Sequence, residues 1–160
     1  MENLHHFLSN QDDGSAVYWG HKVKREALGT DVIYPDEFAG IVLSKQGLRR
    51  LGTKGDYNRF CNGVNASEGV MFAMCMASLG IQFGDARDDE ARSRFLLHSP
   101  GVYLDDSLPP TPWFKDLELE SLRPSSSISH SLISFGRAPV SRYPGYTYTI
   151  YNQIILTNKT

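Results

Sequence analysis

Three kinds of side chain in this sequence could form a centre with a cysteine nucleophile. Cys61 precedes a long apolar run, His98 follows that run, and Asp105 and Asp106 lie beyond the histidine. A thiolate becomes an effective nucleophile when an imidazole takes its proton and an acid orients the imidazole. The residue types therefore allow nucleophilic chemistry at Cys61 with His98 as its base.

The order of cysteine, histidine and acid resembles the papain-like and transglutaminase-like cysteine hydrolases. The resemblance implies hydrolysis by attack of Cys61. Those enzymes place the cysteine at the start of a helix, whereas Cys61 lies six residues before Ser67, where we expect a helix to begin. We keep this reaction as an alternative hypothesis.

A second set of features lies between Val17 and Ser67, and its order is more informative than any single member. It begins with a strand-like aromatic stretch that ends in glycine and histidine, and it ends with a glycine-led segment that precedes a buried helix. Its members are Val17-Tyr18-Trp19-Gly20-His21-Lys22, residues 38–50 with Gly47-Leu48, the loop-like residues 52–57, and Gly63-Val64-Asn65-Ala66-Ser67. This order resembles the ADP-ribosyltransferase superfamily, especially its diphtheria-toxin and poly(ADP-ribose) polymerase branch.

The resemblance implies an α+β fold with split β-sheets and cleavage of the nicotinamide–ribose bond of NAD. That reaction develops an oxocarbenium-like cation, so the site must hold the ribose, stack the nicotinamide and supply negative charge. It implies NAD as a substrate, no metal, and transfer of ADP-ribose by an effector or toxin to a protein or nucleic-acid target. The implied catalytic residues are His21, Ser67 and Glu68, and the implied cofactor-binding residues are Tyr18, Tyr57 and Arg49, with Arg50 as a second candidate for the pyrophosphate.

The family carries a catalytic glutamate on a late strand, and this chain has no acidic residue after Glu120. Gln153, in the matching segment, can form hydrogen bonds but brings no charge. We therefore expect slow turnover, an acid supplied by Asp56 or Glu68, or a degenerate site. The third hypothesis is a non-catalytic effector or inhibitor that binds a host or partner protein.

The elements that would position these residues follow from hydrophobic spacing and from glycine and proline. Helices are expected early and strands late, which is typical of an α+β domain. We expect strands at 16–20, 95–97, 101–104 and 146–156, and helices over about 35–47 and 67–79. We expect irregular structure at 1–14, 21–31, 52–57, 85–94 and 107–124.

Size and charge limit the possible functions. The chain has 160 residues, 41% hydrophobic and 21% charged, and we expect one domain over residues 1–160. Its net charge of −2 gives no strong signal for nucleic-acid binding. A protein target or partner fits the composition better.

We expect Cys61 and Cys75 to form no disulfide, because two cysteines are too few for a disulfide scaffold. The N-terminus has no signal-peptide pattern, and no apolar stretch reaches the ~18 residues of a membrane span. We therefore expect a cytoplasmic protein, or one delivered into the cytosol of a host or target cell. The two Asn-x-Ser/Thr sequons would then be fortuitous.

Overall fold

The computed structural model describes residues 2–27, 29–62, 67–104, 128–139, 141 and 145–146. Its central sheet has three strands, with β1 (Val17–Gly20) between β4 (Ile41–Leu43) and β5 (Gln82–Phe83). β1 pairs antiparallel with β4 and parallel with β5. β1 confirms the strand expected at 16–20, and its Tyr18 and Trp19 are both buried.

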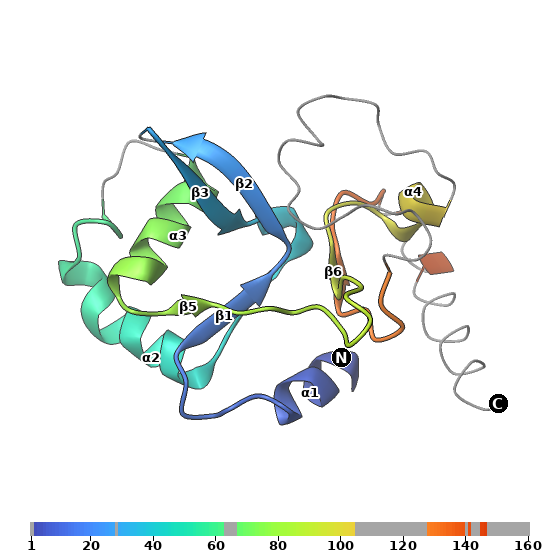
Figure 1. Cartoon of the computed structure of the whole chain (residues 1–160), viewed down its shortest axis with the longest axis horizontal. Helices are drawn as coiled ribbons and strands as arrows, with labels where there is room; N and C mark the ends of the chain where they lie inside the picture. The colour runs from blue at the N-terminus through green and yellow to red at the C-terminus, as the bar shows by residue number, and fades with distance from the viewer. Residues whose placement is uncertain are drawn as a thin grey trace.

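Two smaller sheets accompany the central one (Figure 1). β2 (Lys22–Ala27) and β3 (Thr30–Pro35) form an antiparallel hairpin that lies beside α3 (Glu68–Ser78), and β6 (Phe95–Leu96) pairs in parallel with β7 (Ser134–Phe135). Helices and mixed sheets together make this an α+β fold.

The first thirty-five residues are more regular than expected. Residues 2–9 form the helix α1 (Glu2–Ser9), not an irregular lead-in, and its Phe7 packs edge-on against Trp19. Residues 22–35 form the β2–β3 hairpin where we expected a loop over 21–31, and its turn contains Gly29 at φ +75°. The prediction failed because the charged β2 residues are exposed, so the strand shows little apolar alternation.

The expected helix over 35–47 is wrong. The chain forms a 3₁₀ turn, η1 (Glu37–Ala39), passes Gly40 at φ +86°, and continues as β4. A helix, α2 (Lys45–Lys54), then runs through Gly47 and is followed by η2 (Gly55–Tyr57), so 52–57 is not a loop. Gly47 does not end a helix. It lets α2 approach β1, because a Cβ there would lie 3.2 Å from the Val17 carbonyl oxygen.

The helix expected over 67–79 is confirmed as α3, and Gly80 follows it at φ +67°. Met76 is fully buried, whereas Phe72 is only partly buried against Tyr18. Ser67 occupies the N-cap position but makes no side-chain capping hydrogen bond. The apolar composition of the run therefore predicted the helix better than it predicted the burial of each side chain.

The later part of the chain corrects further expectations. Residues 85–94 form a loop as predicted, and β6 confirms the strand near 95–97. α4 (Pro100–Leu104) replaces the strand expected at 101–104. Gly145 and Tyr146 are helical, and the remainder of the expected 146–156 strand and all of 107–124 lie outside the described residues. In the described part, four of the seven strands precede α2, which reverses the expected order.

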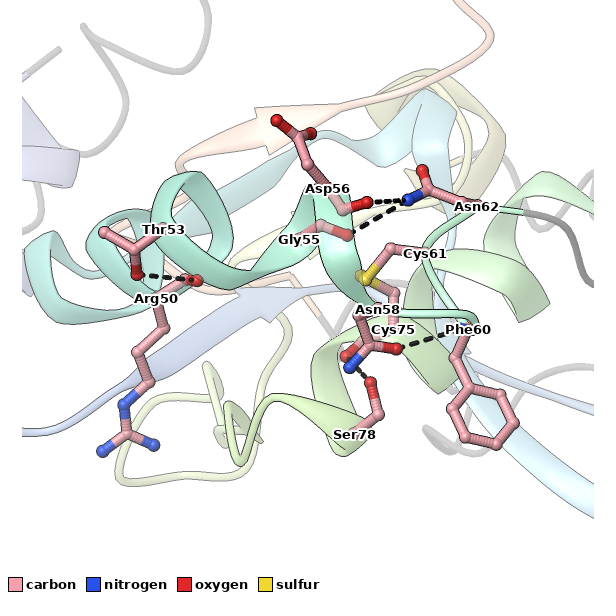
Figure 2. The surroundings of a disulfide bond; sticks show 10 residues. All are labelled: Arg50, Thr53, Gly55, Asp56, Asn58, Phe60, Cys61, Asn62, Cys75 and Ser78. Atoms are coloured by element: carbon pink, nitrogen blue, oxygen red, sulfur yellow. Dashed lines mark hydrogen bonds between the residues drawn. A yellow bond between two sulfur atoms is a disulfide. The ribbon is translucent and has the colours of Figure 1, made fainter.

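Cys61 and Cys75 form a disulfide, so the prediction of two free thiols is wrong. Figure 2 shows the bond joining the turn after η2 to the middle of α3. The side-chain amide of Asn62 donates to the carbonyl oxygens of Gly55 and Asp56 at 3.3 and 2.7 Å, and these bonds hold the turn against η2. The disulfide thus links the turn after η2 to α3, two segments whose contact cannot be predicted from the local sequence.

Candidate functional site

The segments after β3 and β7 meet at a cluster that we call the polar corner, made of His21, Asp36, Phe38, His98 and Arg137. One Asp36 carboxylate oxygen accepts from the backbone N–H groups of Phe38 and Ala39 at 3.0 and 3.2 Å. The other accepts from the Arg137 guanidinium at 3.1 Å. Asp36 therefore caps the η1 turn and also binds a segment far along the chain.

Close backbone approach fixes the geometry of the corner. A Cβ at Gly136 would lie 2.7 Å from the Leu97 carbonyl oxygen and 2.8 Å from that of Phe38. Arg137 has φ +45°, an unfavourable conformation for a residue with a side chain. Its guanidinium also donates to the Leu97 carbonyl oxygen at 3.1 Å, and this bond helps to hold that conformation.

Two histidines lie on the inner side of the corner. His21 is 1% exposed, with Nδ1 at 2.8 Å from the Phe95 carbonyl oxygen. Burial lowers the pKa of His98, the positive charge of Arg137 and the neighbouring His21 act in the same direction, and Asp36 opposes them. The imidazole of His98 therefore favours its neutral form at neutral pH.

The outer side of the corner presents an aromatic ring and a cation. Phe38 is 59% exposed, and the Arg137 guanidinium carbon lies 4.6 Å from its ring centroid. The ring and the partly exposed cation together offer a stacking surface and hydrogen-bond donors within a small area. This arrangement is suited to binding a polar ligand. In the described ranges no group of three His, Cys, Asp or Glu side chains could hold a metal.

The residues expected to bind NAD occupy different surroundings. The Tyr18 ring stacks on Phe83 at 4.4 Å, and burial raises the pKa of Tyr18 to about 12. Tyr18 also lines a mainly apolar groove of about 560 Å³, together with residues of β3, α3 and β5. Tyr57 on η2 is 94% exposed, and Arg49 lies on the exposed side of α2.

The expected catalytic residues are likewise spread over the fold. His21 belongs to the polar corner, whereas Ser67 and Glu68 are exposed at the start of α3. Their convergence on one NAD molecule stays a prediction. The alternative hydrolase would first need reduction of the Cys61 disulfide, because a disulfide sulfur carries no thiolate. Asp105 and Asp106 lie outside the described residues.

Sequence reasoning missed three members of the corner. Asp36 is of a residue type that favours the N-cap of a helix, but the element it caps is the short 3₁₀ helix η1 and not the expected helix over 35–47. Phe38 falls within the helix expected over 35–47, but it lies on η1 and its ring is exposed. Arg137 carried no local signal, because its partners Leu97 and Asp36 are 40 and 101 positions away.

No family model matches the chain. Among curated proteins, the chain is similar to glycoprotein-N-acetylgalactosamine 3-beta-galactosyltransferase 1 of Xenopus laevis, with 33% identity over 104 residues. The match covers 65% of this chain and 28% of that protein. The matched part thus spans less than a third of the relative's length.

Proposed function

We propose that this chain takes part in glycosyl transfer to glycoproteins, and that its polar corner binds a sugar. The observation that carries the proposal is the 33% identity over 104 residues with a galactosyltransferase whose name specifies N-acetylgalactosamine on glycoproteins. This proposal replaces NAD as the preferred ligand. NAD-dependent ADP-ribose transfer remains the competing hypothesis that the experiment must separate.

The chemistry of the corner supports a sugar ligand. A pyranose offers hydroxyl groups at its rim and a C–H face that packs on an aromatic ring. Arg137, whose side chain is 32% exposed, can donate to hydroxyl groups, Asp36 holds the guanidinium in place, and the exposed Phe38 ring can cover the C–H face. Few polar groups placed around an apolar surface are typical of small-molecule sites.

The disulfide supports the same proposal, because structural disulfides form and persist in oxidising compartments. Glycoproteins are assembled in such a compartment. We therefore propose the secretory pathway as the place of action, in preference to the cytosol expected from the sequence. No helix in the described residues is long and apolar enough to cross a membrane.

Binding is a sharper test than turnover, because the match spans only 28% of the relative. We would use saturation-transfer NMR and thermal shift with benzyl α-N-acetylgalactosaminide, UDP-galactose and, for comparison, NAD. We expect at least one sugar ligand to show saturation transfer and to raise the melting temperature, because a ligand that binds the native state stabilises it. NAD should do neither.

Two variants locate the site. Phe38→Ala should remove the sugar signal. Leu48→Ala should keep it, because Leu48 is also an exposed apolar residue but lies on α2, outside the polar corner. Stabilisation by NAD alone would reinstate the ADP-ribosyltransferase hypothesis. If none of the three ligands binds, the non-catalytic partner-binding hypothesis replaces ours.

A further inference from the structure

The exposed face of α2 carries positive charge around an exposed leucine. We call Lys45, Leu48 and Arg49 the basic stripe. Lys45, Leu48 and Arg49 are three and four positions apart and so lie on one side of the helix. Leu48 is 62% exposed. The stripe therefore combines cations with an apolar contact at its centre.

No acidic residue of α2 balances these cations. Arg50 is directed elsewhere, since its guanidinium donates to the carbonyl oxygen of Gly80 at 2.7 Å. Lys45 and Arg49 are exposed and form no ion pair with any residue in the described part of the chain. Uncompensated like charges on neighbouring turns destabilise a helix slightly, and a negatively charged partner would relieve this.

α2 is held firmly and leaves its outer face open. The Ser44 hydroxyl oxygen accepts from the Gly47 N–H at 3.0 Å, which caps the helix, and Arg50 ties its middle to the end of α3. At Gly52 a Cβ would meet nothing within 4 Å, so the helix surface next to Leu48 and Arg49 is open. A preformed, open surface of this kind costs little to order when a partner binds.

We propose that the basic stripe docks an acidic amphipathic segment of a partner polypeptide. Carboxylates of the segment pair with Lys45 and Arg49, and an apolar side chain covers Leu48. Charge complementarity gives the stripe its selectivity, and burial of Leu48 distinguishes a polypeptide from a plain polyanion. A membrane surface is less suitable, because interfacial helices need a broad apolar face. The exposed face of α2 has one strongly exposed leucine, Leu48.

The probe is a fluorescein-labelled peptide of four Glu-Leu-Glu-Glu repeats, followed by fluorescence anisotropy at low and physiological salt. We expect saturable binding that weakens as salt screens the charges. Arg49→Glu should weaken it about tenfold, which corresponds to about 1.4 kcal/mol. Arg25→Glu, the same charge reversal on the exposed part of β2, should leave the affinity nearly unchanged. Leu48→Ser should also weaken binding, and circular dichroism should show that all variants are folded.

Two results would overturn the proposal. Equal affinity for a peptide of Glu-Ser-Glu-Glu repeats would show that the leucine contact contributes nothing and that the stripe binds any polyanion. Binding to phosphatidylserine vesicles or heparin that depends on Arg49, without binding to the leucine peptide, would assign the stripe to a membrane or a polysaccharide.

Discussion

The carboxylate of Asp36 and the guanidinium of Arg137 lie 3.1 Å apart, although 101 positions separate them in the chain. Their side chains are 10% and 32% exposed, so water screens the pair only partly. The same carboxylate accepts two backbone N–H groups of η1. One side chain therefore sets a local turn and fixes the return of a distant segment against it.

Replacement of Asp36 should accordingly cost more than the loss of an ordinary ion pair. We expect Asp36→Ala to lower the free energy of unfolding by about 2–4 kcal/mol, because three hydrogen bonds to a charged group are lost. Asp36→Asn, which keeps an acceptor for the turn, should cost less. Urea unfolding gives both values.

The matched control is Asp31→Ala. Asp31 pairs with Lys24 at 3.0 Å, but the two side chains are 59% and 40% exposed. Exposed pairs contribute about 0–1 kcal/mol. If Asp36→Ala were no more destabilising than Asp31→Ala, the organising role of Asp36 would be refuted.

The disulfide should be a main contributor to stability. It closes a loop with a sequence separation of 14, for which chain-entropy arguments give about 3 kcal/mol. We expect the Cys61→Ser/Cys75→Ser double variant to lose roughly that amount in chemical denaturation. Dithiothreitol should destabilise the wild-type protein and leave the double variant unaffected. A wild-type melting temperature that reductant does not change would contradict the assignment.

The elements that could be predicted from the sequence are those specified locally. α3 combines an unbroken apolar run with an acidic first turn and a following glycine, and β1 concentrates aromatic residues before Gly20. The β2–β3 hairpin was missed because it depends on contacts between its two strands, such as the diagonal ion pair of Lys24 with Asp31. Local patterns cannot show such pairing.

The candidate site could be predicted only in part, for the same reason. His21 was selected for its position after an aromatic strand, and the structure places it in the polar corner. The contact of Arg137 with Asp36 could not be predicted, because it depends on the pairing of β7 with β6. The disulfide was missed because no pattern around Cys61 shows that its turn folds back onto α3.

Glycine replacements test the close approach at the corner. A methyl group at Gly136 would meet the carbonyl groups of Leu97 and Phe38 below 3 Å, so the backbone must move. We expect Gly136→Ala to destabilise the protein by about 1–3 kcal/mol, the usual cost of inserting a group into a packed site. Gly52→Ala is the contrasting variant: it lies in α2 with open space around it and should stabilise the protein by about 0.5–1 kcal/mol. Thermal denaturation of both variants should show shifts of opposite sign, and a neutral Gly136→Ala would mean that the corner is loosely packed.

The pH dependence of stability should depend on His98. Burial, Arg137 and His21 lower its pKa in the folded protein, so the unfolded chain binds more protons as the pH falls through about 6.5. Stability should therefore decrease from pH 7 to pH 5. The carboxylates with lowered pKa, such as Asp85 at about 2, affect stability only below about pH 5, so they do not obscure this range. His98→Gln should flatten the dependence when urea midpoints are compared at pH 7, 6 and 5. His130→Gln, at an exposed position, should retain it, and an equal slope in wild type and His98→Gln would show that His98 is not the titrating group.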